Sequence, residues 1–206
     1  MTAASVCTVT TAPRGRSLGI AVVYPGHELR AEAEQLIEGV YASTFAVRLT
    51  SHFPVLIAVI DEDNRVVAAA GCRRADDEPL FLEQYLDEPI EHALWRQAGK
   101  PVVRSEVMEI GSLAATGVGP AAQMLFAALA AFLYEEGAVY AVATATCRLR
   151  SAFRAFGFGA DEIAPAKLTK LPNGGADWRG YFKHDPVVVW GHVASGVGGA
   201  RAGARI

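Results

Sequence analysis

The sequence predicts an α/β fold, because segments typical of strands and segments typical of helices alternate along it. In the stretch 107–158, an apolar strand pattern enters a glycine turn and is followed by an apolar helix, a second strand and a second helix. Earlier in the chain, two strand patterns flank a polar turn at residues 62–64, which predicts a hairpin. With 206 residues, 51% of them hydrophobic, the chain can bury one substantial core.

The first half of the chain begins with a Thr/Ala-rich segment. Residues 1–15, like the Gly/Ala-rich residues 195–206, bury too little apolar surface to order themselves, so we expect flexible ends around one domain at 16–194. Residues 80–96 carry Pro89 in their middle, which predicts two short helical pieces. The other expected elements are a strand at 18–24, an amphipathic helix at 28–46 and hairpin strands at 55–61 and 65–73.

The second half carries the order strand, turn, helix, strand, helix. Pro120 suits the first position of a helix, because its missing N–H would have no partner there, and Gly137 and Gly157 end the two helices. The expected elements are strands at 107–115 and 140–146, helices at 121–136 and 147–156, and a late strand pair at 180–182 and 187–193.

The turn before the first of these helices reads Thr116-Gly117-Val118-Gly119-Pro120-Ala121. Glycines let the backbone turn tightly, and the free N–H groups of the turn and of the helix N-terminus favour a bound anion. Glycine turns between a strand and a helix are common, so by itself this one indicates a phosphate site only weakly.

Composition excludes several classes of function. The net charge of −3 and the pI near 6.0 leave no basic surplus, so we expect no nucleic-acid partner. The three cysteines are widely spaced, and residues 1–13 carry no apolar signal core, which together predict a reducing, cytoplasmic location. No apolar run has the length of a transmembrane segment. No metal is expected, because metal-ligand spacing is missing among His27, His52, His92, His184 and His192.

A run upstream of the strand at 107–115 carries the most specific pattern. It reads Pro79-Leu80-Phe81-Leu82-Glu83-Gln84-Tyr85-Leu86-Asp87-Glu88-Pro89-Ile90-Glu91, and it is accompanied by runs at 109–115, 144–146 and 178–182. With these runs the chain, over residues 24–193, resembles the bacterial thermostable hemolysin family. Members of that family are similar to GNAT-type N-acyltransferases and to acyl-homoserine-lactone autoinducer synthases.

The resemblance implies a GNAT-like fold, which is a mixed, twisted sheet with helices on both faces. The strands at 107–115 and 140–146 would splay apart and accept a pantetheine arm. The implied activity is transfer of a fatty acyl group from acyl-CoA or an acyl carrier protein to a small amine or amino-acid-like acceptor. The alternative, suggested by the family name, is a lipid-binding or membrane-lytic protein without acyl transfer. An open cleft at Glu109 beside Gly111 would favour the enzyme.

The chain departs from these relatives at three positions. Autoinducer synthases have a Glu-x-Ser-Arg-Phe run, and Ser112 stands here at its Arg position, so amine acylation in general is expected more than homoserine-lactone chemistry. GNAT enzymes open the pyrophosphate loop with Gln or Arg, and many have a catalytic Tyr in the last helix. Here these positions hold Ala114 and Phe153, so the loop is shortened and a general acid comes from elsewhere or from water.

Glu109 is the candidate general base, as its counterpart is thought to be in the autoinducer synthases. Strand alternation places it on the face of Val107, Gly111 and Leu113, in an apolar cleft where desolvation raises its pKa. Gly111 would leave space for a ligand beside it. Glu106, on the other face of the strand, is the reserve base if the register slips by one residue.

Four further residues are candidates for binding the acceptor. Arg73 matches an arginine of the autoinducer synthases, and its guanidinium fits a carboxylate; the alternative is a surface charge. Glu83 and Asp87 are one helical turn apart and share a face, which resembles an acceptor-binding pair but is also typical of a solvated face. Arg104 completes the set. Alternatively, Arg104 or Arg73 forms a structural ion pair with Glu109.

The acyl donor is expected at the end of the strand and in the turn after it. Backbone N–H groups near residues 113–115 would stabilise the oxyanion of acyl transfer. The complete set of donor-binding candidates is Leu113, Ala114, Ala115, Gly117, Val118, Gly119, Ala121 and Ala122.

Overall fold

The computed structural model describes residues 17–117 and 119–196, which form a mixed sheet with the strand order β1-β2-β3-β4-β5-β7-β6. β4 and β5 pair in parallel, and the other neighbours pair antiparallel. The strands are β1 (Gly19–Val23), β2 (Val55–Ile60), β3 (Val66–Arg74), β4 (Val107–Ala115), β5 (Tyr140–Ala145), β6 (Asp161–Pro165) and β7 (Val187–His192).

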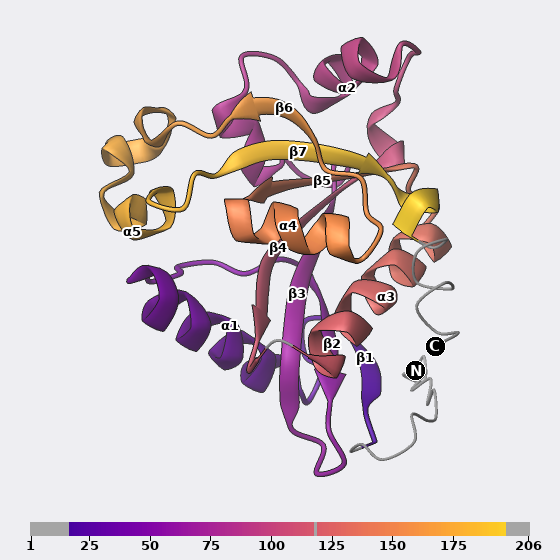
Figure 1. Ribbon diagram of the computed structural model, residues 1–206, viewed down its shortest axis with the longest axis vertical. Helices are drawn as coiled ribbons and strands as arrows, with labels where there is room; N and C mark the ends of the chain where they lie inside the picture. The colour runs from indigo at the N-terminus through magenta and orange to yellow at the C-terminus, as the bar shows by residue number, and fades with distance from the viewer. Residues whose placement is uncertain (1–16, 118, 197–206) are drawn as a thin grey trace.

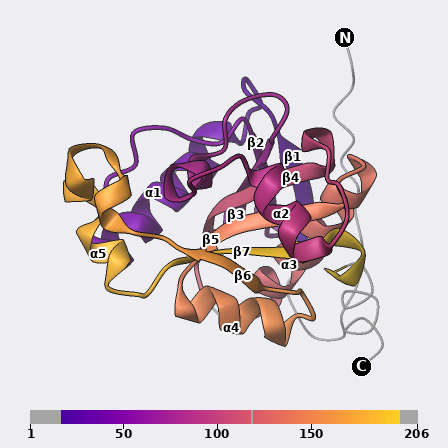
Figure 2. The same ribbon diagram turned by 90° about the horizontal axis from the view of Figure 1, so that it is seen from above.

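Helices cover both faces of this sheet, as expected. The α-helices are α1 (Arg30–Phe45), α2 (Ile90–Ala98), α3 (Pro120–Glu135), α4 (Cys147–Ala155) and α5 (Arg179–Phe182). Short 3-10 helices are η1 (Phe81–Tyr85), η2 (Arg104–Glu106), η3 (Leu168–Lys170) and η4 (Pro172–Trp178). Apolar clusters place α1, η1 and α2 on one face and α3 and α4 on the other; Figure 2 shows α1 and α2 on one side of β7 and α4 on the other. We call these faces the α1 face and the α3 face.

The expected hairpin and the two helical pieces of residues 80–96 are confirmed. β2 and β3 pair antiparallel across the turn. η1 ends at Tyr85 because the backbone at Leu86 is extended, with φ −95° and ψ 159°, and α2 begins immediately after Pro89. Proline has no N–H for an intrahelical bond, so it stands before a helix more easily than inside one.

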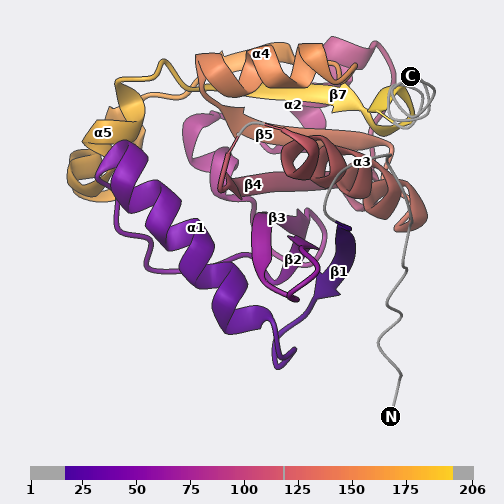
Figure 3. The ribbon, with the colours of Figure 1, turned by 60° about the horizontal axis from the view of Figure 1, so that its bottom comes forward.

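The late strand pair is predicted wrongly in one of its members. Residues 180–182 belong to α5, and β7 pairs instead with β6, which the sequence patterns missed. β6 reads Asp-Glu-Ile-Ala-Pro and lies at the sheet edge, where charged residues and proline are tolerated, so its pattern is weak. α5 packs on the end of α1, as Figure 3 shows, and a Cβ on Gly180 would lie 1.6 Å from the carbonyl oxygen of Phe45.

β4 and β5 separate halfway along their length, which confirms the expected splay. Residues Val107 to Ile110 of β4 pair with Tyr140 to Ala143 of β5, after which β5 continues only with β7. In Figure 1, β3 and β4 run down the picture while β5, β7 and β6 run across its upper half. From Gly111 onward, the β5 side of β4 therefore has no strand partner among the described residues.

A β-bulge lies in β4 where the strands separate. Ala69 pairs with Ala114 and Gly71 pairs with Gly111, so one residue of β3 faces two of β4, and Ser112 adopts φ 50°. The bulge reverses the alternation. Leu113 consequently packs on the α3 face and Ala114 on the α1 face, so the expectation that Leu113 shares a face with Glu109 is wrong.

Candidate active site

Glu109 is buried in β4 and is held by the first turn of η1. Glu109 is only 2% exposed. One carboxyl oxygen accepts the N–H of Phe81 at 2.9 Å, and the other accepts the N–H of Leu82 at 3.0 Å. These N–H groups open the 3-10 helix and have no partner within it, so the carboxyl of Glu109 joins η1 to β4.

Burial raises the pKa of Glu109 to about 7, although the two N–H groups and the positive charge of Arg73 act in the opposite direction. The desolvation expected from the sequence is therefore confirmed. A carboxyl group with a pKa near neutrality exchanges protons readily at physiological pH, which is the property of a general base or acid.

An aromatic cluster lies on the α1 face and includes Phe81 and Tyr85 of η1. Phe81 lies 5.6 Å from Trp178 and 6.1 Å from Tyr85 between ring centroids. Tyr181 stacks on Tyr41 at 6.3 Å, and its hydroxyl donates to the carbonyl of Thr144 in β5 at 2.9 Å. The members of the cluster are Tyr41, Phe45, Phe81, Tyr85, Trp178, Tyr181 and Phe182. The cluster thus packs η1, which binds the carboxyl of Glu109, against η4 and α5.

The space beside Gly111 is filled, so the expectation of an open cleft is wrong for this structure. A Cβ on Gly111 would lie 2.3 Å from the ring of Phe53, and a Cβ on its cross-strand partner Gly71 would lie 2.4 Å from the same ring. Phe53 belongs to residues 46–54, which connect α1 with β2 without regular secondary structure. No periodic pattern marks these residues, so the sequence does not identify Phe53 as a site residue.

Arg73 stands beside Glu109 but is paired elsewhere. The two residues are cross-strand partners in β3 and β4. The guanidinium of Arg73 lies 4.8 Å from the ring centroid of Phe53, and its Nε lies 3.0 Å from a carboxylate oxygen of Glu78. It also donates to the carbonyl of Pro79 at 3.3 Å. Arg73 therefore connects the candidate base with Phe53.

Arg104 forms a network of its own with two acidic residues. Its guanidinium lies 2.6 Å from Glu83 and 2.8 Å from Glu91. Glu83 also accepts the N–H groups of Leu80 at 2.9 Å and of Ile90 at 3.0 Å, which ties η1 to α2. Burial raises the pKa of Glu83, but its hydrogen bonds with Arg104 and the backbone outweigh burial and lower it.

Two expectations about acidic residues are wrong in their geometry. Glu83 and Asp87 do not share a face, because η1 ends before Asp87, whose side chain is 91% exposed and pairs with Lys170. Glu106 lies in η2, ahead of β4, where its side chain accepts the N–H of Val103 at 3.5 Å. The argument from strand alternation therefore does not apply to Glu106.

The glycine turn lies open at the N-terminus of α3. A Cβ on Gly117 or on Gly119 would meet no atom within 4 Å, and neither glycine has a left-handed backbone. Val118 lies outside the described residues. The N–H of Gln123 donates to the carbonyl of Gly119 at 3.1 Å, so the N–H groups of Ala121 and Ala122 precede the hydrogen-bond ladder of α3. Such groups suit an anion.

The comparison with protein families gives one result that covers most of the chain. Residues 23–197 match the model of the thermostable hemolysin family. The chain belongs to the thermostable hemolysin family. The expectation drawn from the run at 79–91 is therefore confirmed. No curated protein matches the chain.

Solved structures show the fold of this chain. FeeM, an N-acyl amino acid synthase from uncultured soil microbes, matches with TM-score 0.60 and 15% identity over 87% of this chain and 92% of FeeM. MesI, a CoA-dependent acyl-homoserine lactone synthase, matches with TM-score 0.54 and 14% identity over 91% and 95% of the two chains. The catalytic domain of Tetrahymena GCN5 histone acetyltransferase, in complex with coenzyme A, matches with TM-score 0.50 and 12% identity over 85% and 93%. The expected GNAT-like fold is confirmed.

The runs that carry the family resemblance contact one another in the fold. Residues 79–91 supply η1, whose N–H groups bind the carboxyl of Glu109, and the beginning of α2. Residues 178–182 supply Trp178, against Phe81, and Tyr181, whose hydroxyl reaches β5 within the run 144–146. The residues by which the sequence resembles the family are thus joined to one another through η1.

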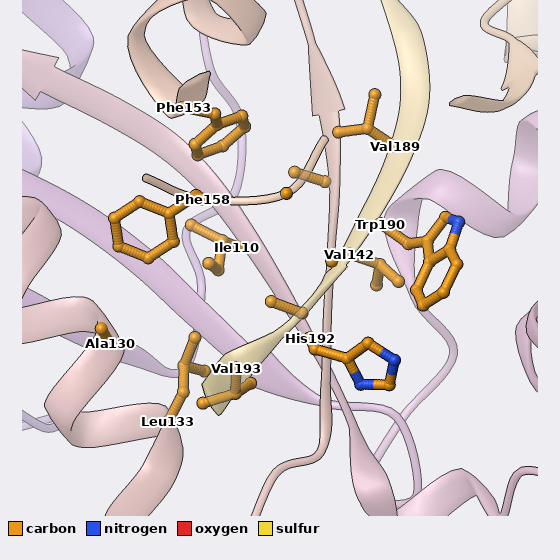
Figure 4. Close-up of a pocket in the computed structure, with 14 residues that line it drawn as sticks. Ile110, Ala130, Leu133, Val142, Phe153, Phe158, Val189, Trp190, His192 and Val193 are labelled. Atoms are coloured by element: carbon orange, nitrogen blue, oxygen red, sulfur yellow. The ribbon is translucent and has the colours of Figure 1, made fainter. Parts of the chain in front are cut away.

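Elsewhere in the described structure, the pockets and side-chain clusters do not indicate a second catalytic or metal-binding site. A small apolar pocket with room for about 20 Å³ lies by α3 and α4; in Figure 4, Phe153, Phe158 and Ile110 lie on one side of β7, and Trp190 and His192 lie on the other. That volume corresponds to about one water molecule. In the part of the chain that the structure describes, no cluster of three His, Cys, Asp or Glu side chains could hold a metal ion. None of the helices formed by the described residues has the length and apolarity to cross a membrane.

Proposed function

We propose that the chain is an N-acyltransferase that moves a fatty acyl group from a pantetheine thioester to a small amine or amino-acid-like acceptor. The observation that carries the proposal is the place of Glu109. It is a buried carboxyl with a pKa of about 7, and it lies on the strand that separates from its parallel neighbour two residues later. Enzymes place groups of perturbed pKa where protons are transferred.

The donor, acyl-CoA or an acyl carrier protein, would lie along the unpaired side of β4. Residues 113–115 offer backbone groups there, because β5 pairs with β4 only as far as Ile110. The phosphate end would meet the turn at residues 116–122, where the N–H groups of Ala121 and Ala122 begin α3. The fold is one in which GCN5 binds coenzyme A, and MesI is CoA-dependent, which supports a thioester donor.

The chemistry requires one proton to leave the attacking amine. An aliphatic ammonium with a pKa near 10 is mostly unreactive at neutral pH, so a base beside it contributes roughly 10²–10⁴-fold. An ammonium acceptor first releases one proton to solvent and becomes a free amine. The amine nitrogen then forms a bond to the thioester carbon, the carbon–sulfur bond breaks, one N–H proton of the amine passes to Glu109, and the thiolate takes a proton from water. N–H groups of residues 113–115 would stabilise the oxyanion.

Arg73 would orient an acceptor that carries a carboxylate. It faces Glu109 across β3 and β4, and a guanidinium fork binds two carboxylate oxygens well. Glu83 and Arg104 support the site differently, because their ion pair holds η1, whose N–H groups fix the carboxyl of Glu109. We therefore assign Arg104 and Glu83 to positioning η1. Asp87 is exposed and receives no role in the proposed mechanism.

The test is mass spectrometry of purified protein incubated with acyl-CoA or acyl carrier protein of varied chain length and with a panel of small amines and amino acids. We expect an N-acyl product, and Glu109→Gln should lower turnover by about 10²-fold or more. Exposed Glu162 on β6 provides the matched control, Glu162→Gln, which should retain full turnover. Glutamine has one acceptor oxygen for two N–H donors, so thermal unfolding and thioester binding are measured for each variant.

Rescue at high pH separates a chemical role from a structural one. At high pH more acceptor is free amine, so Glu109→Gln should recover part of its turnover, whereas a displaced η1 would not recover. Wild-type turnover in Glu109→Gln would contradict the assignment of Glu109 as the general base. The base would then be Glu106 or water, and the turnover of Glu106→Gln distinguishes the two. Dye release from liposomes without any acyl donor, together with no product from any pair, would favour the lipid-binding or membrane-lytic alternative.

A further inference from the structure

Two glycines face each other in the middle of the sheet beneath one aromatic ring. Gly71 of β3 and Gly111 of β4 are cross-strand partners. The Cγ end of the Phe53 ring lies 2.4 Å from the place of a Cβ on Gly71, and the Cζ end lies 2.3 Å from that on Gly111. The ring therefore extends from one strand to the other and occupies the space that two side chains would fill. Real Cβ atoms do not come that close to other atoms, so both positions require glycine while Phe53 is in place.

The segment that carries Phe53 is fastened to α1 through its backbone. Arg30 donates to the carbonyl of Phe53 at 2.7 Å and to that of Pro54 at 3.1 Å. Glu34, one turn further along α1, lies 2.6 Å from Nε of the same arginine. Residues 46–54 form no helix or strand, so these bonds, and not a hydrogen-bond ladder, fix the position of the ring.

Phe53 lies on the path to Glu109 along the sheet. Gly111 is the next residue of β4 on the same face as Glu109, and Gly71 is next to Arg73 on that face of β3. The guanidinium of Arg73 lies 4.8 Å from the ring centroid. On another side of Glu109, η1 contributes the N–H groups that bind its carboxyl. A molecule that approaches the carboxyl over the glycine pair therefore meets the ring of Phe53.

We propose that Phe53 determines the acceptor specificity of this site: its ring fills the space above Gly71 and Gly111 and restricts the acceptor to amines with a small substituent. The inference rests on the proposed function and names the substrate feature that the site selects. Phe53→Ala removes the ring and frees a phenyl-sized space above the two glycines. An acceptor with a large apolar side chain can then place that side chain where the ring was.

The first test measures the contact and needs no catalysis. Gly111→Ala should lower the melting temperature of the full chain by about 4 °C or more, because its methyl group collides with the ring. In a Phe53→Ala background the same change should cost little. Gly39→Ala in α1, where a Cβ meets no atom within 4 Å, is the matched control and should behave alike in both backgrounds. Equal effects of Gly111→Ala with and without the ring would overturn the packing on which the proposal stands.

The second test measures specificity with one acyl donor and the acceptors glycine, alanine, leucine and phenylalanine. Phe53→Ala should raise the ratio of kcat/KM for phenylalanine to that for glycine by about 10-fold or more relative to the wild type. Phe156→Ala is the control, since Phe156 is also half-buried but packs against Phe126 beside α4. Phe53→Leu gives a smaller change in the same direction and serves if Phe53→Ala fails to fold.

The two tests fail in distinguishable ways. An active enzyme whose ratio is unchanged in Phe53→Ala and in Phe53→Leu would overturn the role of Phe53 and leave the acyltransferase intact. A wild type that acylates none of these or other amines would overturn the proposed function, and the specificity role falls with it. The melting temperatures would still report whether Phe53 is packed on the glycine pair.

Discussion

Arg73 and Glu109 face each other across β3 and β4, yet the carboxylate that Arg73 pairs with is that of Glu78. The charge of Arg73 acts on Glu109 through space and lowers its pKa, whereas burial raises it further, so that the carboxyl titrates at about 7. A buried carboxyl beside an unengaged positive charge would remain ionised well below neutrality. Burial outweighs the charge of Arg73 and the two backbone hydrogen bonds, so Glu109 can gain and lose a proton near pH 7.

The first prediction follows from this relationship and concerns Arg73→Gln. Removal of the positive charge should raise the pKa of Glu109, since that charge now lowers it. The pH profile of kcat/KM should move to higher pH, with a loss of roughly 3- to 10-fold at pH 6. At pH 9, where the base is ionised in both proteins, only acceptors that carry a carboxylate should still react more slowly. A profile that moves to lower pH would contradict the electrostatic account.

The second prediction is a pH dependence of stability. The pKa of Glu109 is raised from its usual 4.5 to about 7 in the folded protein, so between these values the native state binds more protons than the unfolded state. Its contribution to stability is complete below pH 4.5 and is lost as the pH rises through 7, by at most about 3 kcal/mol. Urea unfolding at pH 5 and pH 8 should show this loss in the wild type. Glu109→Gln, which cannot titrate, should show a smaller change, and equal changes would contradict the assignment.

The sequence predicts the fold wherever a local pattern decides the structure. Prediction fails where a contact between distant residues decides it. Apolar periodicity and proline placed the two pieces of residues 80–96, and alternation placed Glu109 on the correct face. The bulge at Ser112 could not be inferred, because its positive φ arises from the pairing of β3 with β4. Phe53 was missed for the same reason. It lies 18 residues from Gly71 and 58 from Gly111 along the chain, and nothing in residues 46–54 signals that contact.

The third prediction separates support of the fold from acceptor binding at Arg104. Arg104→Ala removes a partner from both Glu83 and Glu91 and a donor from the carbonyl of Ala75. Since the group is partly exposed, the free energy of unfolding should fall by about 1–2 kcal/mol. Arg96→Ala is the control, because its ion pair with Glu88 is exposed and should matter far less. Unchanged stability with a raised KM for the acceptor would instead show direct binding by Arg104.

The fourth prediction concerns the turn before α3 and uses the double variant Gly117→Val, Gly119→Val. Side chains at these positions meet no protein atom within 4 Å, so the melting temperature should change little. The added isopropyl groups would nevertheless stand beside the N–H groups that open α3 and keep a diphosphate from approaching the backbone. Calorimetry with acyl-CoA should therefore show affinity reduced by about tenfold or more, a cost of ~1.4 kcal/mol.

Gly39→Val on α1, also free of neighbours, is the matched control and should bind the thioester like the wild type. If the double variant binds acyl-CoA with unchanged affinity, the phosphate end of the donor does not contact this turn, and a carrier protein that delivers only its pantetheine arm becomes the better donor.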